Sequence, residues 1–317
     1  MTSPRIAAIG LASWDQLLLV DHYPQPGEYR IVLQQESLPG GTTTNLAIAL
    51  ARLGATVSLR AVVGDDEPGK HLVAELERAG VDTGMITTRD GEPTDASTII
   101  VSRKPFDRTI YWHVGAAIRK GDLLDIWHLF GQDVLVLDIA DHPLRRFLTD
   151  LPAHSVPAVR MLGTLTYLVE SGQPDELDVA FRFDTLVGNE REFQVLTGAS
   201  SPATALEFVQ NRMPGTNLRT AVMSGGDSGC RIATRDQQWQ VPAFDVDVLD
   251  ATGAGDAFAA GIAWGMALRW PWERTGTFAN ALGALATRGF GAQVTLPTWD
   301  EVMELIESQG RGAILDT

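Results

Sequence analysis

The segment VLDATGAGDAFAAGIAWGMAL, residues 248–268, has residue types and spacing suited to phosphate chemistry. An apolar strand end leads into Gly253, Ala254, Gly255 and Asp256, and a run of small residues follows. Glycines at a strand-to-helix turn let backbone N–H groups approach a phosphate, and the helix N-terminus adds partial positive charge. The pattern predicts an anion site in which Asp256 lies beside the phosphate.

A structural interpretation of the same residues stays open. Gly-Ala-Gly before an alanine-rich helix also permits close packing of that helix on a sheet, and aspartate is common in a first helical turn. Two competing phosphate motifs fit worse, because the chain has no GxxxxGK[ST] and GAGDAF does not complete GxGxxG. A P-loop enzyme and a dinucleotide-dependent dehydrogenase are therefore disfavoured.

A second polar group lies near the N-terminus. Asp15 follows the apolar segment IAAIGLASWD, and Gly40, Gly41 and Asn45 surround the start of the next helical segment. Glycine lets the backbone approach a polyol, and the asparagine amide can donate and accept hydrogen bonds at once. Taken singly, Asp15 can equally be a solvated turn residue and Asn45 a helix-start residue.

These motifs occur in the order found in one family. DATGAGDAFAAG resembles the C-terminal signature DTxGAGD of ribokinase-like (phosphofructokinase B type) carbohydrate kinases, with the threonine displaced to Thr252. LPGGTTTNLAIALARLGA (38–55) and VGDDEPGKHLVAELERAGVDT (63–83) resemble the N-terminal signature. The resemblance covers nearly the whole chain. It implies that Asp256 is the general base and that residues 253–255 form an anion hole.

The resemblance also assigns the acceptor end of the site. It implies that Asp15, Gly40, Gly41 and Asn45 bind the hydroxyls of a sugar. Two departures alter the ribose-specific pattern: residues 42–44 are all threonine where Gly-Lys or Gly-Ala is common, and an alanine precedes SWD where asparagine is common. The identity of the sugar is therefore left open.

Metal and nucleotide positions follow from the same resemblance. Asn189 and Glu192 in VGNEREF match an NxxE motif that helps place Mg²⁺ largely through water, although a polar helix start would explain them equally. Asp250 and Thr252 match positions that hold a monovalent cation, potassium, in some relatives. The nucleotide positions implied are Ser224, Gly226 and Gly229 in SGGDSG, and Asn280.

The elements that must position these residues alternate along the chain. Short apolar strands such as 5–11, 134–140 and 219–226 alternate with amphipathic helices, which favours a parallel sheet covered on both faces. Residues 28–37 and 95–113 lack a helical period and predict extra strands. We expect a ribokinase-like three-layer α/β/α sandwich with a mainly parallel central sheet, as one domain spanning 1–317. Lid strands are expected at about 16–38 and 92–113.

Composition narrows the function further. The chain has 317 residues, a net charge of −15 and one cysteine, Cys230, so nucleic acid is a poor partner and an intrachain disulfide is excluded. No apolar stretch approaches the roughly 20 residues that span a bilayer. A reducing, cytoplasmic setting is expected, and an apolar face on the lid would allow two copies to pair.

Together these features predict an ATP- and Mg²⁺-dependent kinase that phosphorylates a hydroxyl of a sugar-like molecule. Two alternatives remain. A nucleoside kinase of the same family would stack a base on Trp14, Tyr111 or Trp112. A sensor protein on the kinase scaffold would bind without catalysis, but it would have no need for Asp256 at the phosphoryl position.

Overall fold

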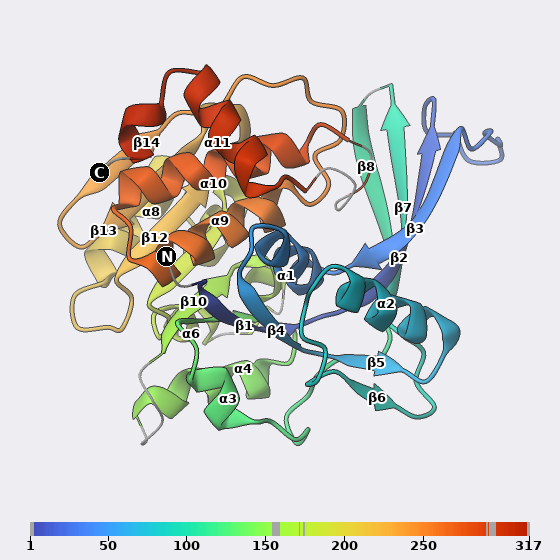
Figure 1. Cartoon of the computed structure of the whole chain (residues 1–317), viewed down its shortest axis with the longest axis horizontal. Helices are drawn as coiled ribbons and strands as arrows, with labels where there is room; N and C mark the ends of the chain where they lie inside the picture. The colour runs from blue at the N-terminus through green and yellow to red at the C-terminus, as the bar shows by residue number, and fades with distance from the viewer. Residues whose placement is uncertain are drawn as a thin grey trace.

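The computed structural model has a central eight-stranded sheet between two helical layers and a smaller sheet beside them (Figure 1). The described residues are 3–104, 106–153, 159–170, 172–173, 175–289, 291 and 296–315. The central strands run in the order β14-β13-β12-β11-β10-β9-β1-β4. Their bounds are β1 Arg5–Gly10, β4 Thr56–Arg60, β9 Val134–Asp138, β10 Arg160–Thr164, β11 Thr185–Asn189, β12 Thr220–Ser224, β13 Cys230–Thr234 and β14 Gln238–Val241.

All of these strands are parallel except β13, which pairs antiparallel with β12 and β14. Strand β9 illustrates why they are buried on both sides. Val134 and Val136 join one apolar cluster, whereas Leu135 and Leu137 join the other, as expected where alternate residues point to opposite faces. A three-layer α/β/α sandwich with a mainly parallel sheet is therefore confirmed.

One helical layer packs in the first cluster and comprises α1 Thr42–Arg52, α2 Glu67–Arg78, α9 Ala254–Leu268, α10 Trp272–Ala286 and α11 Trp299–Ser308. The other layer packs in the second cluster and comprises α3 Ile126–Phe130, α4 His142–Asp150, α5 Thr166–Glu170, α6 Glu176–Ala180, α7 Glu190–Thr197 and α8 Pro202–Arg212. In Figure 1, α9 and α10 lie above the sheet and α3 and α4 below it. Within the described residues, no helix is long and apolar enough to span a membrane.

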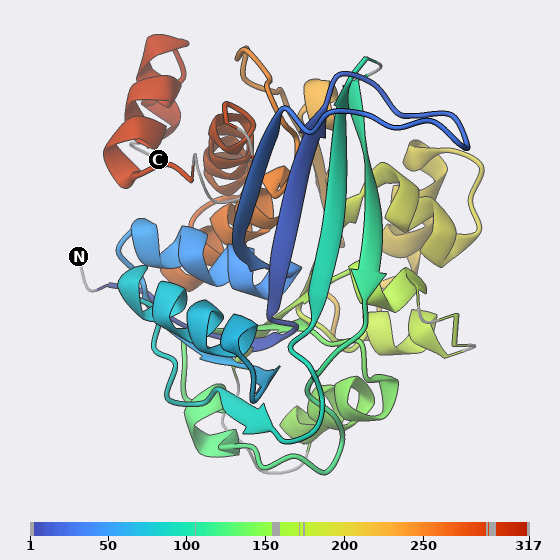
Figure 2. The same ribbon diagram turned by 90° about the vertical axis from the view of Figure 1, so that its right-hand side faces the viewer.

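A four-stranded sheet stands upright beside α1 and α2 (Figure 2). Its strands run in the order β3-β2-β7-β8, with bounds β2 Ser13–Val20, β3 Gln34–Gly40, β7 Ala96–Arg103 and β8 Phe106–His113. Leu17, Leu19, Ile99 and Val101 form its own small apolar cluster. A separate two-stranded sheet pairs β5 Val62–Gly64 with β6 Thr87–Arg89.

Two details of this small sheet differ from the sequence-based expectation. The strand expected at 28–37 begins only at Gln34, and residues 28–33 make no strand. Tyr29 and Ile31 alternate with polar residues but are 88% and 73% exposed, so their alternation reflects no buried face. The second difference is that β2 starts at Ser13, which places Asp15 inside a strand of the small sheet.

Candidate active site

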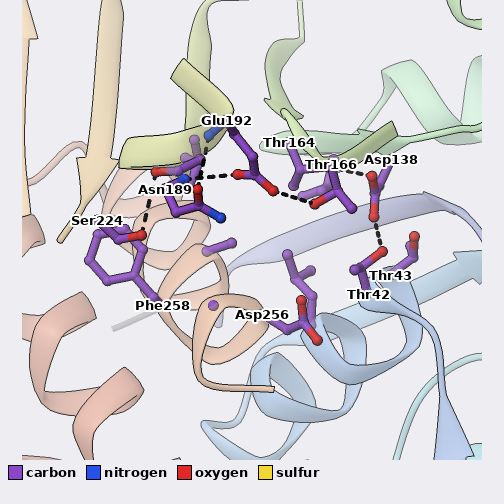
Figure 3. Close-up of a pocket in the computed structure, with 16 residues that line it drawn as sticks. Thr42, Thr43, Asp138, Thr164, Thr166, Asn189, Glu192, Ser224, Asp256 and Phe258 are labelled. Carbon is purple, nitrogen blue, oxygen red and sulfur yellow. Dashed lines mark hydrogen bonds between the residues drawn. The ribbon is translucent and has the colours of Figure 1, made fainter. Parts of the chain in front are cut away.

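The carboxyl ends of four neighbouring parallel strands, β9, β10, β11 and β12, meet at one edge of the central sheet. Residues at or just beyond these ends line a pocket together with the first turns of α1 and α9 (Figure 3). In open α/β sheets, this edge is where ligands bind. The polar side chains lining the pocket are Thr42, Thr43, Asp138, Thr164, Thr166, Asn189, Glu192, Ser224 and Asp256.

Asp256 lies in the first turn of α9. Gly253 precedes the helix with a φ of 77°, a left-handed conformation that favours glycine, and it has no side chain to cap the first-turn N–H groups. Further along the helix, a Cβ on Gly261 would lie 2.6 Å from the Ala279 Cα, so the small residues also serve close packing on α10. The structural and the anion-site interpretations of this segment are therefore compatible.

The carboxyl group of Asp256 has a pKa close to neutral pH. It keeps partial access to the pocket, but protein atoms enclose it densely, and this burial raises its pKa to about 7. A hydrogen bond from Asn45 and the charge of Arg108 lower the pKa, whereas Glu192 and Asp15 raise it. Asp256 can therefore accept a proton at neutral pH and hold it.

Asn45 meets Asp256 from the opposite end of the chain. Its Nδ2 donates to Oδ2 of Asp256 at 2.8 Å, joining α1 to α9 across 211 residues of sequence. Gly41 precedes α1 with a φ of 87°, and a Cβ there would lie 2.8 Å from the Leu11 carbonyl oxygen. Two helix N-termini therefore converge on the Asn45–Asp256 pair, and both favour negative charge.

Asp15 is buried rather than solvated, with 8% of its surface exposed. Its Oδ1 accepts hydrogen bonds from Ser13 Oγ at 2.8 Å and from the Ser97 N–H at 3.0 Å. A Cβ on Gly40 would lie 2.0 Å from Asp15 Oδ2, so glycine is needed for this carboxylate to lie against β3. Burial raises the pKa of Asp15 to about 6, Asp95 adds to the increase, and the two hydrogen bonds oppose it.

Asp138 is a pocket residue that the motif search missed. It ends β9, is 2% exposed, and accepts hydrogen bonds from the hydroxyls of Thr42 and Thr164, the latter at 2.5 Å. Burial raises its pKa to about 7, and the negative charges of Asp256 and Glu192 contribute. A signal was present, because Asp138 is the polar residue at the end of the apolar strand VLVLD.

Asn189 and Glu192 form a capping box at the start of α7. The Glu192 N–H donates to Asn189 Oδ1 at 2.9 Å, and the Asn189 N–H donates to Glu192 Oε2 at 2.8 Å. Thr166 also donates to Glu192 Oε1 at 3.2 Å. The helix-start interpretation therefore holds, yet Glu192 still lines the pocket. Glu192, Asn189 and Asp138 offer the oxygen ligands that Mg²⁺ prefers, so these residues fit the ion.

The predicted nucleotide residues lie farther along the same edge. Ser224 ends β12 directly opposite Asn189 in the β11–β12 register, and its hydroxyl donates to the Gly188 carbonyl at 3.4 Å. Gly226 and Gly229 have φ values of 58° and 83° in the turn that follows. A Cβ on Gly229 would lie 2.0 Å from the Val241 carbonyl oxygen, so this glycine also permits the turn to pack on β14.

Asn280 and Asp250 both make structural contacts. The Asn280 amide is buried and donates to the carbonyl oxygens of Val241 and Pro242 at 3.1 Å each. Asp250 is 2% exposed and accepts from the N–H and hydroxyl of Thr252 at 2.9 and 2.7 Å. Its other oxygen accepts from the Gly291 N–H at 2.9 Å.

Comparison with known proteins identifies the family. Residues 3–299 match the model of the pfkB family of carbohydrate kinases. This chain belongs to that family. The kinase is 26% identical to a Bacillus subtilis ribokinase over 95% of its own length and 99% of the relative. It shares its fold with the crystal structure of a Thermotoga maritima ribokinase, with a TM-score of 0.79, 23% identity and coverage of 96% and 99%.

A second solved structure has the same fold. The Arabidopsis thaliana ribokinase complexed with ribose and ATP superposes with a TM-score of 0.80 at 22% identity, covering 96% of this chain and 99% of that one. The family match and the relatives make the protein an ATP-dependent carbohydrate kinase. The expected family, fold class and enzyme class are confirmed.

Proposed function

We propose that this kinase transfers the γ-phosphoryl group of ATP to a hydroxyl of a small sugar or sugar-like acceptor, with Asp256 as the general base. The observation that carries the proposal is the 2.8 Å hydrogen bond from Asn45 to the pocket residue Asp256, where the N-termini of α1 and α9 converge. A pKa of about 7 suits a group that must take up a proton at neutral pH and later release it.

The reaction begins with the acceptor hydroxyl beside Asp256. The carboxylate takes the hydroxyl proton as the oxygen forms a bond to the γ-phosphorus, and the bond from that phosphorus to the bridging oxygen of ADP breaks. ADP leaves with the electron pair of the broken bond. Asp256 then returns its proton to solvent. Most of the catalytic effect comes from positioning and electrostatics, as in other phosphoryl transfers.

The first turn of α9 supplies the proposed anion hole. The N–H groups of Gly253, Ala254 and Gly255 lie beside Asp256, where negative charge builds up on the phosphoryl oxygens. A Cβ on Gly255 would meet no atom within 4 Å, so this side of the turn is open to a ligand. Magnesium held through water by Asn189 and Glu192 would neutralise phosphate charge at the neighbouring strand end.

The two substrates occupy opposite ends of this edge in our proposal. Asp15 with Gly40, Gly41 and Asn45 binds the acceptor hydroxyls. The nucleotide lies toward Ser224, Gly226, Gly229 and Asn280, where the turn after β12 is packed on β14. Asp250 and Thr252 remain a proposed monovalent-cation site for potassium, close to the start of α9.

The small sheet acts as a lid in this proposal. It carries Asp15 on β2 and stands beside the first turn of α1, so closing it over the pocket would exclude water from the reaction (Figure 2). The chain is then one kinase domain, 1–317, with the lid strands inserted between β1 and α1 and between α2 and α3. Exposed apolar residues on β8 give the lid a surface on which a second copy could pair.

A panel assay tests the proposal. ATP consumption would be measured with Mg²⁺ and pentoses, hexoses, sugar acids, sugar phosphates and nucleosides, each compared with no acceptor. We expect acceptor-dependent turnover with one of the sugar-like classes, and loss of that turnover in Asp256→Asn. Turnover with nucleosides alone would identify the alternative, a nucleoside kinase. No acceptor-dependent turnover with any class would contradict the proposal.

A further inference from the structure

The pocket has a surplus of negative charge. Asp138, Glu192 and Asp256 line it, and none of the described residues that line it is a lysine or an arginine. The mutual repulsion of these carboxylates contributes to the raised pKa values of Asp138 and Asp256. ATP brings several more negative charges, and the whole chain carries a net charge of −15. A cationic side chain that adds to Mg²⁺ and the helix N-termini must therefore reach the phosphates from outside the pocket wall.

The strand register of the lid indicates that Arg108 is a cation that can reach the phosphates. Asp15 and Leu19 lie on the same face of β2, because they are four residues apart. Leu19 pairs with Val101 of β7, and Val101 pairs with Arg108 of β8. Directly paired residues of adjacent strands point to the same face, so Arg108 shares the face of the lid that carries Asp15.

The side chain of Arg108 is available for a ligand. It is exposed, and its guanidinium has no hydrogen bond or ion pair with any other described residue. Among the charged groups that influence Asp256, Arg108 has the largest effect, ahead of Glu192 and Asp15. The guanidinium therefore lies on the Asp256 side of the lid, within electrostatic reach of the reacting atoms.

We propose that Arg108 is a catalytic residue whose guanidinium binds a phosphate group beside Asp256 when the lid closes. The inference rests on the proposed function and adds the Arg108 guanidinium, a cation, to the proposed active site. The planar guanidinium can donate two parallel hydrogen bonds to phosphate oxygens. The charge of Arg108 then enters the site only with the lid, so the phosphates are neutralised most strongly in the closed, water-free state.

Two different phosphate groups could occupy this position, and the guanidinium would bind either one through the same hydrogen bonds. One is the transferring γ-phosphoryl group of ATP. The other is a phosphate carried by the acceptor itself, in which case the kinase acts on a sugar phosphate. Arg108→Ala removes the cation, Arg108→Lys keeps the charge without the paired donors, and Arg103→Ala removes an equal charge from the same lid face, two residues beyond Val101.

The first arm uses nucleotide alone. Titration calorimetry with Mg²⁺ would give the dissociation constants of adenylyl imidodiphosphate and of ADP for each protein. If Arg108 binds the γ-phosphoryl group, the preference for the triphosphate analogue falls about 10- to 100-fold in Arg108→Ala, the range expected for a charge-assisted contact, and kcat falls for every acceptor. Arg108→Lys retains part of the preference, and Arg103→Ala stays close to wild type.

The second arm uses the acceptors. If Arg108 binds a phosphate on the acceptor, Arg108→Ala raises KM for the sugar phosphate about 10- to 100-fold and leaves the nucleotide preference unchanged. The proposal is overturned if Arg108→Ala and Arg103→Ala behave alike in both arms. Should the wild type fail with every acceptor, the proposed function falls, and the nucleotide arm still decides whether Arg108 contacts the γ-phosphoryl group.

Discussion

The hydrogen bond from Asn45 to Asp256 makes the pH dependence of this kinase adjustable by one substitution. As the proposed general base, Asp256 would remove a proton only when it is ionised, so kcat should rise with pH through a pKa of about 7 and level off above it. The Asn45 amide stabilises the ionised form, because its Nδ2 donates to the carboxylate at 2.8 Å. Asn45→Ala removes that donor and should move the rising limb of the kcat–pH profile to higher pH.

The size of the shift follows from the strength of the bond. A hydrogen bond to a charged group contributes about 1.5–3 kcal/mol, and one pKa unit corresponds to about 1.36 kcal/mol. The limb should therefore move up by about 1–2 units. At pH 7, the ionised fraction of Asp256 would fall from about one half to about one tenth or less, and kcat would fall in proportion.

The assay is kcat from pH 5.5 to 9.5 at saturating ATP and acceptor. Saturation matters, because Asn45 is also proposed to bind the acceptor, and its loss should raise KM separately. A variant damaged only in structure would lose activity at every pH, whereas this variant should approach the wild-type kcat above pH 9. An unshifted limb, or a wild-type profile that is flat from pH 5.5 to 8.5, would refute the reasoning.

Four further outcomes are expected. Asp256→Asn should lower kcat by about 10²–10⁴ while calorimetry finds ATP binding intact; a kcat within about threefold of wild type would remove the base assignment. Asp15→Ala should raise KM for the acceptor at least about tenfold, since a buried hydrogen-bonding carboxylate is lost, and an unchanged KM would place the acceptor elsewhere. Glu192→Gln should shift the Mg²⁺ titration of the rate to higher concentrations, and an identical titration would leave Glu192 with its capping role alone. Tyr111 is 56% exposed on the lid, and Tyr111→Glu should convert a dimer into a monomer in light scattering; a monomeric wild type would contradict the lid interface.

The sequence predicted the family, the enzyme class and the layered sheet because these depend on local and ordered signals. The apolar strand and helix patterns specify buried faces, and the glycine-rich motif around Gly253 requires a particular turn. In the structure that residue has a φ of 77° and precedes a helix. The ordered motifs also located Asp256 and Asn45, which the fold then brings to 2.8 Å.

Residues outside the motifs were harder to find. Asp138, Thr164 and Thr42 come from separate elements, and only the pairing of β9 with β10 and the docking of α1 bring their side chains together. The need for glycine at residue 40 is likewise a tertiary effect, because it depends on how closely Asp15 approaches from the neighbouring strand. The strand expected at 28–37 begins only at Gln34, because the exposed apolar residues near Tyr29 imitate a strand pattern.

The Asn45–Asp256 contact also has a consequence for how the protein is made. The two residues are separated by 211 positions, so the ribosome adds the proposed base long after it has added the residues proposed to hold the acceptor. A growing chain that ends before α9 has the lid and β9 but neither the carboxylate nor the helix turn for the phosphoryl group. Under the proposed mechanism, synthesis order withholds catalytic competence from chains that end before α9.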